Sequence, residues 1–586
     1  MSTAAKPVLA GGEFLLRDLQ ADEIFTPEDF TSEHRAVAKT VEEFWASEVA
    51  PQLENLQHQE PGVAVSLLRK SAELGLTSAV IPEDYGGMGL DLTSMMVIAE
   101  GVAKDGSYAA WHGAHTGIGT LPILFFGTEE QKRRYLPKLA TCEMIAAYCL
   151  SEAHAGSDAM AARTTARLSE DGTYYILNGQ KMWITNGGAA DLFTVFAKVN
   201  DKLTAFLVER SYDGVKSGPE EKKMGIKGSS TCPIYLDAVK VPVGNVLGEV
   251  GRGHIIAFNI LNLGRLKLGP FAVGGAKNVL AASIQYAKER VAFGKPIAQF
   301  GLIQQKLALM GTLLYAAESM SYAVDGLVNR LSGGLDWNLP DATSRVLKAA
   351  EEYAIECSFV KVFASEMLDT VVDEGVQIHG GYGYHQDYLV ERAYRDSRIN
   401  RIFEGTNEIN RLLATGMLLK RAQKKQLPLV EAVMKLRSEL LDAPQPSSLP
   451  SEKRMVQQGK KVVLLLLGVA YERFGSDIEQ QQEVMAAIAD AMMMTFALEC
   501  AGLRTEKFTG GGSGRTAALY TALFSEAAVA EIEKSALRVI AVCSEGDERR
   551  TQIALVRKLL RHETADTISI GRGAAAALLS AGRYTV

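Results

Sequence analysis

The sequence predicts an α+β protein: an N-terminal helical domain, a central barrel-like β-sheet domain, a helical-bundle domain and a C-terminal helical extension. Three observations predict this order. Apolar residues first recur at helical spacing, short β-favouring runs between Gly, Asn and Asp turns follow, and helical spacing then returns. The expected boundaries are an N-terminal segment at 1–30, the N-terminal helical domain at 31–147, the β domain at 148–250, the helical bundle at 251–426 and the extension at 427–586.

The N-terminal helical domain is predicted from the spacing of its apolar side chains. Val37, Val41 and Phe44 recur every three or four positions, as do the leucines between 67 and 76. A glycine-rich turn at 82–89 interrupts this pattern. We therefore expect several helices and not one long helix.

The β domain is predicted from runs rich in aromatic and β-branched residues. These runs lie at 174–177, 182–185, 192–199 and 204–208, and turn residues separate them. The sheet is expected to end near Gly248.

The helical bundle is predicted from four long amphipathic segments, at 255–268, 275–292, 301–330 and 341–372. A Pro/Ser-rich linker at 443–452 precedes a last segment rich in Ala, Leu and Met, which is typical of a further helical domain. Apolar residues near this linker predict either a helix packed on its own domain or a peripheral membrane contact. These residues are Leu429, Val430, Val433, Met434, Leu436, Leu440 and Leu441.

The composition excludes several classes of function. The 62 basic and 69 acidic residues give a net charge of −7 without a long like-charge run, so we expect no nucleic-acid partner. Six scattered cysteines without a C-x-x-C pair indicate reduced thiols, and the nine histidines form no ligand pattern, so we expect no metal. The acidic start lacks the features of a signal or transit peptide. The longest apolar run, 462–470, is too short for a membrane span, so a cytoplasmic protein is expected.

Glu404 is the candidate general base. It lies between the apolar pair Ile402 and Phe403 and a Gly-Thr turn. Burial beside an aromatic ring disfavours the charged carboxylate and raises its pKa, and the missing side chain at Gly405 lets a substrate approach the backbone. A lone Glu in such a run is more often a helix cap or a surface residue, so other parts of the chain have to support this interpretation.

Four other runs carry candidate binding residues. Residues 147–158 and 181–188 supply hydroxyls and the ring of Trp183, which can orient a flat aromatic cofactor, although an edge strand with a buried Trp is an equal alternative. Residues 289–304 contain Arg290, whose guanidinium suits paired phosphate oxygens or closes a helix. Residues 376–384 contain adjacent glycines, which allow a close approach of the backbone to an anion but more often only mark a turn.

Five such motifs in order over roughly residues 80–415 resemble the acyl-CoA dehydrogenases, flavoenzymes that desaturate acyl thioesters. The resemblance implies FAD as cofactor and an acyl-CoA as substrate. One departure is Ser151-Glu152-Ala153-His154, where the family usually has Thr-Glu-Pro; Ser151 keeps the hydroxyl that would meet the flavin. Another departure is Gly301, where the family often has Gln, so one FAD contact is expected to be absent.

The resemblance also implies the residues that bind the cofactor. Trp183 and Thr185 would lie along the flavin ring, Ser157 would contact flavin and coenzyme A, and Arg290 and Phe293 would reach the FAD of a second subunit. The full expected set is Tyr148, Leu150, Ser151, Ser157, Trp183, Thr185, Arg290, Phe293, Gln377, Gly380, Gly381, Thr406 and Glu408.

For the substrate, the resemblance implies α,β-desaturation, in which Glu404 removes the proton next to the thioester carbonyl and a hydride leaves the β-carbon for the flavin. Some branches place the base on an earlier helix, but that position is Gly264 here, which cannot accept a proton. The expected substrate-binding residues are Ser157, Asn262, Arg265, Phe403, Gly405, Ala110 and Ala114. The two alanines leave room for a long acyl chain.

These features, with the C-terminal extension, resemble the very-long-chain branch of the family. That branch implies fatty-acid β-oxidation, a homodimer and electron-transferring flavoprotein as the electron acceptor. An acyl-CoA oxidase and an assembly or scaffold protein on the same fold are the alternatives; the intact Glu404 favours the enzyme.

Overall fold

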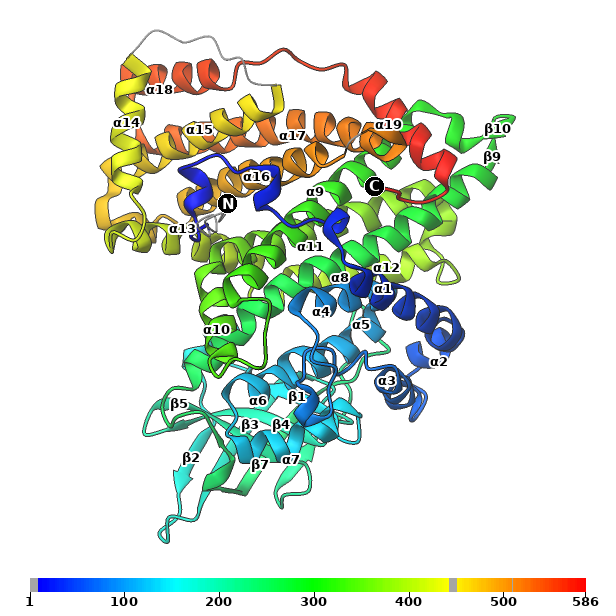
Figure 1. Cartoon of the computed structure of the whole chain (residues 1–586), viewed down its shortest axis with the longest axis vertical. Coiled ribbons are helices and arrows are strands. Elements are labelled where there is room, and N and C mark those ends of the chain that lie inside the picture. The colour runs from blue at the N-terminus through cyan, green and yellow to red at the C-terminus, as the bar shows by residue number, and fades with distance from the viewer. Residues whose placement is uncertain (1–8, 442–450, 509) are drawn as a thin grey trace, which may run out of the picture.

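The computed structural model describes residues 9–441, 451–508 and 510–586. Figure 1 shows the sheet at one end of the molecule, the long helices α8, α9 and α11 in the middle and the helices of the extension at the other end. Helices precede the sheet and follow it, so the predicted fold class is confirmed.

The N-terminal part is helical, as predicted. Its helices are α1 (Ser32–Phe44), α2 (Leu53–Gln57), α3 (Val63–Glu73), α4 (Leu92–Val102), α5 (Gly106–Gly113), α6 (Leu121–Phe126) and α7 (Glu129–Ala140). Asp91 and Asp105 accept hydrogen bonds from the first backbone N–H groups of α4 and α5, and these caps fix where both helices begin. A π-helical turn, Ala114–Gly119, continues α5 toward the sheet.

The sheet is mixed. Its strands are β1 (Ala146–Cys149), β2 (Thr165–Leu168), β3 (Tyr174–Thr185), β4 (Leu192–Val199), β5 (Lys202–Glu209), β6 (Val215–Ser217), β7 (Thr231–Pro242) and β8 (Val246–Leu247). They follow the order β6-β7-β3-β2-β4-β5-β8, with β1 beside β4; β1 and β2 run parallel to β4. Tyr175 of β3 packs on Phe206 of β5 with ring centroids 5.2 Å apart, although these strands are not neighbours. The sheet therefore curls around its own core.

The bundle is built on α8 (Gly253–Glu289), α9 (Gly301–Ser332) and α11 (Ala354–His379), which pack against one another. Shorter elements complete it: β9 (Val291–Ala292), β10 (Lys295–Pro296), α10 (Ala342–Glu352), α12 (Leu389–Ser397) and α13 (Asn407–Gln423). The segments predicted at 255–268 and 275–292 form one helix that contains Pro270. Packing of α8 against α4, α9 and α11 offsets the hydrogen bond that proline cannot donate.

The extension contains α14 (Leu429–Leu441), α15 (Ser451–Phe474), α16 (Gln482–Glu506), α17 (Gly511–Cys543), α18 (Gly546–Leu559) and α19 (Thr567–Ala581). Most of the predicted linker, 443–450, lies outside the described residues. In α14, Leu429 and Leu436 are buried, whereas Val430 and Met434 are exposed. The apolar face of α14 thus packs mainly on its own domain, against α15.

The segment before α1 ties the extension to the bundle. The backbone N–H of Gly12 donates to Glu356 of α11 at 2.7 Å, and that of Leu19 donates to Glu499 of α16 at 3.0 Å. Figure 1 shows this segment running between the two groups of helices. It acts as a strap between two layers and not as a separate unit.

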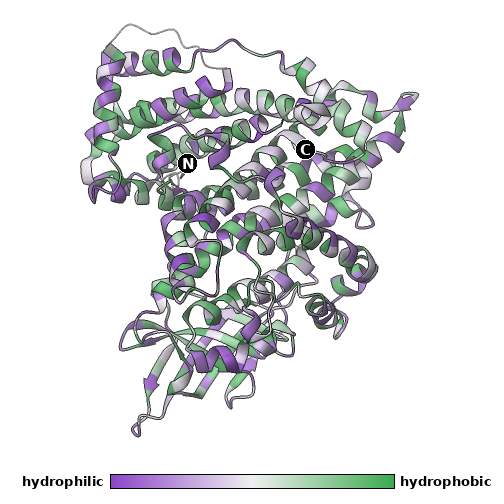
Figure 2. Ribbon diagram, in the orientation of Figure 1, coloured by the Kyte–Doolittle hydropathy of each residue, from purple (hydrophilic) through white to green (hydrophobic). Residues whose placement is uncertain are grey.

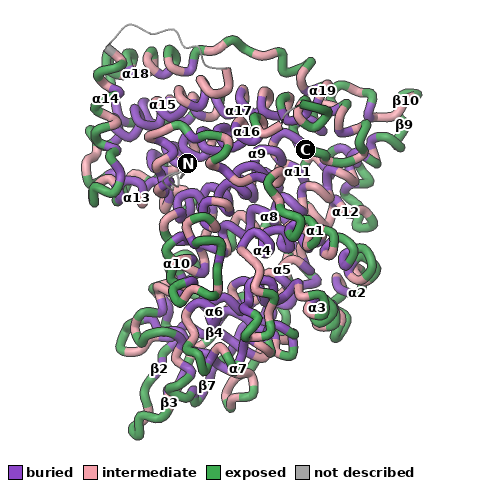
Figure 3. Tube along the Cα trace, in the orientation of Figure 1, coloured by how far each residue is buried: buried purple, intermediate pink, exposed green. Residues whose placement is uncertain are grey.

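Two helices, α9 and α16, are long and apolar enough to cross a membrane by length and composition alone. However, 89% and 83% of their apolar windows are buried inside the protein. Figure 3 shows both helices largely buried, whereas outer helices such as α14 and α18 carry many exposed residues, and Figure 2 shows many hydrophilic residues there. Their composition is that of core helices.

Candidate active site

Glu404 lies in a tight loop between the 3-10 turn Arg398–Arg401 and the start of α13. Its φ is +57° and that of Gly405 is +80°, so two successive residues adopt the left-handed conformation, which costs energy at a Glu. Three side chains hold the loop in place. Arg265 Nε donates to the Glu404 carbonyl at 3.1 Å, and both Lys361 Nζ and Asn410 Nδ2 donate to the Gly405 carbonyl at 2.8 Å.

The Glu404 carboxyl group faces a cavity and lacks a hydrogen-bond partner for Oε2, which is buried. Burial raises the pKa of Glu404 to about 7, although the positive charges of Arg265 and Lys361 oppose this rise. A Cβ atom at Gly264 would lie only 2.7 Å from Glu404 Oε2. Gly264, the position of the rival base, therefore faces the same point as Glu404, and only a glycine leaves room for the carboxyl group.

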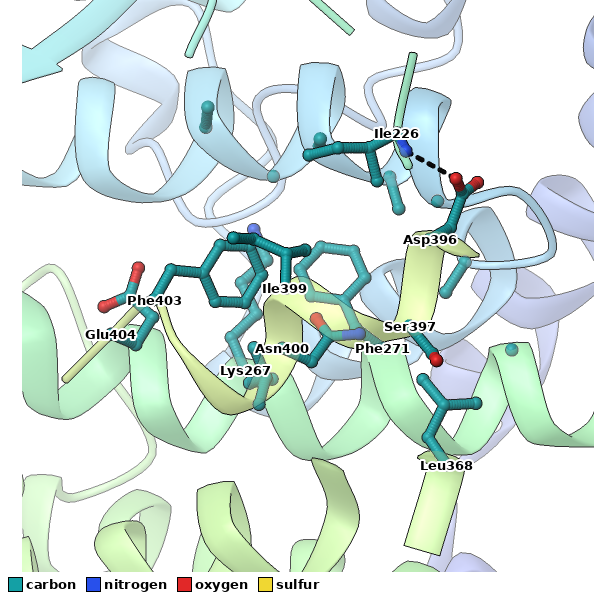
Figure 4. A pocket seen from close by; sticks show the side chains of 18 of the residues that line it. Ile226, Lys267, Phe271, Leu368, Asp396, Ser397, Ile399, Asn400, Phe403 and Glu404 are labelled. Carbon is teal, nitrogen blue, oxygen red and sulfur yellow. Dashed lines mark hydrogen bonds between the residues drawn. The ribbon is translucent and has the colours of Figure 1, made fainter. Parts of the chain in front are cut away.

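The cavity runs beside α8, with Glu404 near one end (Figure 4). Residues of α8 from Ile260 to Val279 contribute to its wall, and Leu368 and Val372 of α11 line the same space. Four of the residues predicted to contact substrate or cofactor line it as well: Ala110, Ala114, Thr185 and Phe403. The wall is mainly apolar, so it suits a long hydrocarbon chain whose one end lies at the Glu404 carboxyl group.

The end of β1 and the bulge of β3 bring a second group of predicted residues to this site. Tyr148 and Leu150 are buried, and Tyr148 Oη is a buried hydroxyl without a hydrogen-bond partner. Burial, followed by the charge of Glu404, raises the pKa of Tyr148, so the two side chains are near each other. Trp183 is 58% exposed and has a φ of +56° where β3 bulges away from β7. An exposed indole held in a strained conformation is expected at a ligand contact.

The loop that carries Ser151 and Ser157 is fixed by an ion pair that sequence reasoning missed. Lys181 Nζ donates to Glu152 Oε1 at 2.6 Å, and both side chains are buried. Glu152 also accepts hydrogen bonds from the backbone N–H groups of Arg163 and Thr164. Ser151 is half-buried, and its carbonyl accepts from the Met182 N–H of β3 at 3.0 Å, whereas Ser157 is exposed. The sequence carried one signal for this ion pair: Lys181 is a charged residue directly before the apolar run Met182-Trp183-Ile184 of β3.

Arg290, Phe293, Gln377, Gly380 and Gly381 form a separate group that does not line the cavity. The Arg290 guanidinium lies 5.5 Å from the centre of the Tyr382 ring, and a Cβ at either glycine would meet no atom within 4 Å. Phe293, at the tip of the β9–β10 hairpin, is 96% exposed. Arg290 follows Gly264 by 26 residues of α8, roughly 39 Å of helix. One chain thus keeps this group far from Glu404.

Asn262 and Arg265 lie behind the Glu404 loop. Both are buried, and Arg265 Nη1 donates to Asn262 Oδ1 at 2.8 Å. Neither lines the cavity, so their role in the structure is to position the loop, and their predicted contact with substrate stays a prediction. Thr406 Oγ1 caps α13 by accepting from the Ile409 N–H at 3.3 Å, and Glu408 follows in the first turn and is exposed. Lys361, which no local pattern singled out, is a further residue that holds this loop.

The fold and the site define an enzyme with a buried carboxyl group at one end of an apolar cavity and with features that fit a flat cofactor. Models of known protein families match most of the chain. The acyl-CoA dehydrogenase N-terminal domain matches residues 31–143, the middle domain 147–239, and two C-terminal domain families match 251–418 and 458–558. The chain belongs to the acyl-CoA dehydrogenase family.

The relatives span different lengths of this chain. A probable acyl-CoA dehydrogenase of Bacillus subtilis is 48% identical over the whole of both chains. The mitochondrial very long-chain specific acyl-CoA dehydrogenase of Bos taurus is 46% identical over 58% of this chain and 51% of its own length. The crystal structure of an acyl-CoA dehydrogenase complexed with FAD from Bacillus anthracis is 49% identical, with a TM-score of 0.96 over 98% of this chain and 100% of that chain.

These matches make the chain an FAD-dependent acyl-CoA dehydrogenase, as the sequence predicted. The residues present fit FAD. The unpartnered Tyr148 hydroxyl, the exposed Trp183 ring and the open space at Gly380 and Gly381 are features that a flat ring and a diphosphate can use.

Proposed function

We propose that this enzyme oxidises long-chain acyl-CoA thioesters to trans-2-enoyl-CoA in fatty-acid β-oxidation, with Glu404 as the base. The observation that carries the proposal is the Glu404 carboxyl group, which has a raised pKa and faces one end of a long apolar cavity. An ordinary Glu is too acidic for efficient abstraction of a carbon-bound proton, and burial corrects this mismatch.

The chain's own residues orient the base and exclude water. Arg265, Lys361 and Asn410 hold the backbone of the loop, so the carboxyl group stays above Gly264. Phe403 and the alanines of α5 and the following turn keep the site apolar. Glu404 takes the proton from the carbon next to the thioester carbonyl, and its backbone N–H polarises the carbonyl oxygen. FAD, when bound, supplies the acceptor for the hydride.

The length of the cavity supports long-chain substrates. From Gly264 to Val279, α8 rises by roughly 22 Å. A staggered hydrocarbon chain with bonds of about 1.52 Å advances about 1.25 Å per carbon, so about 18 carbons fit along this path. Ala110 and Ala114 support the proposal because larger side chains there would narrow the cavity.

We further infer that the working form is a homodimer. Arg290, Phe293 and the glycines of 380–381 lie far from Glu404 along α8, so they contact FAD only if it belongs to another copy of the chain. Electron-transferring flavoprotein is the proposed acceptor of the electrons. An acyl-CoA oxidase would instead pass them to oxygen.

The test is an anaerobic titration of the purified holoenzyme with acyl-CoAs of four to twenty carbons, followed through the flavin spectrum. We expect bleaching by long chains, with half-saturation at lower concentrations than for short ones, and slow reoxidation when oxygen is admitted. Equal responses to butyryl-CoA and palmitoyl-CoA would contradict the chain-length proposal. Rapid reoxidation by oxygen would favour an oxidase.

A further inference from the structure

Lys267 places an amine in the wall of the acyl cavity. It lies on α8 one turn after Gly264, and only 5% of its surface is exposed. Figure 4 shows it between Glu404 and Leu368 along the cavity. Its Nζ atom lies 5.6 Å from the centre of the Phe271 ring, and a Cβ at Gly117 would be 3.7 Å from it. A hydrocarbon chain in this cavity would therefore pass beside a polar group.

The amine is only partly satisfied by the protein. Lys267 Nζ donates to Thr116 Oγ1 at 2.7 Å, and Thr116 Oγ1 in turn donates to the carbonyl of His112 at 2.8 Å. Within 9–441, 451–508 and 510–586, Thr116 is the only acceptor for Lys267, and no carboxylate pairs with it. An amine has at least one further N–H group, charged or neutral. That group is left to the cavity or to a small adjoining pocket.

The adjoining pocket is mostly apolar but contains a few polar side chains. His112, Thr116 and Lys267 line it, and both ring nitrogens of His112 are buried without a hydrogen-bond partner. Burial lowers the pKa of His112 well below its usual value, although the backbone of Leu76 lies near enough to oppose this shift, so the ring is neutral. A neutral imidazole has one donor and one acceptor, and neither makes a hydrogen bond of good geometry here. Two polar side chains with spare hydrogen-bonding capacity thus lie together beside an apolar path, which is uncommon in a protein interior.

A plain hydrocarbon chain gains nothing from this arrangement. It would remove water from the amine and leave an N–H without an acceptor, which costs more than the loss of an average hydrogen bond. A chain that carries an oxygen atom at this level would accept the free N–H. Burial lowers the pKa of Lys267 to about 7, so the amine is neutral in part at physiological pH, and an uncharged oxygen suits it better than a carboxylate, whose desolvation is expensive.

Building on the proposed function, we propose that Lys267 is a specificity-determining residue that favours acyl-CoA substrates with a hydroxyl or keto group a few carbons beyond the bond that is oxidised. Gly264, which faces the Glu404 carboxyl group, and Lys267 are separated by three residues, about 4.5 Å of helix rise. This separation sets the level of the oxygen along the chain. Thr116 and His112 orient the amine from the other side.

Binding without turnover provides the first test. Holoenzyme carrying Glu404→Gln is titrated by calorimetry with palmitoyl-CoA and with palmitoyl-CoAs that carry one hydroxyl at successive carbons from C5 onward. We expect one position to bind about tenfold more tightly than its neighbours, as one added hydrogen bond predicts. The same titrations with Lys267→Met in that background should abolish this maximum and tighten the binding of unsubstituted palmitoyl-CoA.

Two further variants distinguish the loss of a hydrogen bond to the substrate from a general effect of substitution on the protein. Lys267→Gln keeps a donor and should retain the preferred position. Lys435→Met removes an amine from an exposed position on α14, outside the cavity, and should leave the pattern unchanged. A flat series in the unmodified Lys267 background, or a maximum that persists in Lys267→Met, would overturn the proposal. Tightest binding of an ω-carboxyl chain would overturn the choice of an uncharged oxygen. If no acyl-CoA reduces the flavin of the wild-type enzyme, the proposed function fails, and this binding series still gives its own answer.

Discussion

Glu404 combines burial, which raises its pKa, with two positive charges that limit the rise. Sequence reasoning predicts this residue because its motif is local: the apolar pair before it and the glycine after it are neighbours in the chain. Lys361 escapes such reasoning, because it reaches the Gly405 carbonyl from 44 residues away and only the packing of α11 on the loop brings it there. Lys267 escapes it for the same reason.

The first residue-scale prediction concerns the base itself. Glu404→Gln keeps the size of the side chain but removes the proton acceptor, so we expect FAD content to be unchanged and kcat to fall by a factor of about 10⁴ or more. Steady-state assays with palmitoyl-CoA and the flavin absorbance of the purified protein measure both quantities. Normal turnover in this variant would refute the assignment.

The raised pKa of Glu404 predicts how the activity of the enzyme depends on pH. With a pKa of about 7 in the free enzyme, Glu404 is mostly neutral at pH 6 and mostly charged at pH 8, so kcat/KM should rise about tenfold between these values.

Because folding raises the pKa of Glu404 from 4.5, the contribution of Glu404 to the free energy of unfolding is present below pH 4.5 and falls as pH rises to about 7.

Calorimetric Tm values check this sign. Glu404→Gln lacks the titrating group, so its Tm relative to the wild type should be higher at pH 8 than at pH 5. A difference that is the same at both pH values would show that the carboxyl group is not buried in the folded protein.

Among the helices, α8 shows what local sequence patterns predict and what they do not. Its amphipathic halves are predictable from spacing, but Pro270 makes them look like two helices. The single helix exists because neighbours cover it on several sides, which spacing within α8 does not reveal. In contrast, 341–372 reads as one helix and forms two, α10 and α11, which meet at Tyr353; the Tyr353 hydroxyl donates to the Leu9 carbonyl at 2.6 Å. A contact with the distant N-terminal segment accompanies that break.

Two glycines of α8, Gly264 and Gly275, differ in the space that a side chain would have. At Gly264, an alanine Cβ would lie 2.7 Å from Glu404 Oε2, whereas at Gly275 its nearest neighbours would lie at 3.4 and 3.5 Å. Gly264→Ala should therefore displace the carboxyl group and lower kcat/KM by about 10²-fold, since small misplacements of catalytic groups cost this much. Gly275→Ala, on the same helix and in the same cavity, should keep activity toward short acyl-CoAs within about threefold.

Gly275→Ala adds helix propensity without a close contact, so this variant should be at least as stable as the wild type. Stopped-flow reduction of the flavin by butyryl-CoA compares Gly264→Ala with Gly275→Ala. Equal rates for the two variants would mean that Gly264 is not needed to seat the carboxyl group.

At the scale of the molecule, the predicted site residues divide into two sets, one beside Gly264 within α8 and one at the C-terminal end of that helix. The motifs predict both sets, and the family resemblance implies that Arg290 and Phe293 serve a second subunit. The motifs alone do not give the separation, because it depends on the unbroken length of the helix. If a homodimer joins them, Arg290→Ala should weaken FAD retention at least tenfold without changing the sedimentation coefficient of the dimer. Arg345→Ala, in an exposed pair with Asp341, is the matched control. A monomer that retains FAD and full activity would contradict the dimer proposal.

Arg504 of α16 is one of the residues that attach the extension to the rest of the molecule. This buried guanidinium donates to Glu318 of α9 at 2.6 Å and to Glu28 of the N-terminal segment at 2.8 Å, and it lies 4.7 Å from the centre of the Tyr315 ring. Three segments far apart in the sequence therefore meet at one charge. Removal of one partner from a buried ion pair leaves the others unpaired in a medium of low polarity, which is more costly than the net value of the pair.

Arg504→Met fills the same space without the charge, so we expect it to lower the free energy of unfolding by about 3–5 kcal/mol. Lys534→Met removes an exposed charge that pairs with Glu531 on the surface and should cost at most about 1 kcal/mol. Urea denaturation of the two holoenzymes measures the difference. Since Arg504 joins the extension to both α9 and the N-terminal segment, its loss should also make the extension unfold before the bundle, visible as a second transition. A single transition at the wild-type midpoint would mean that apolar packing alone docks the extension.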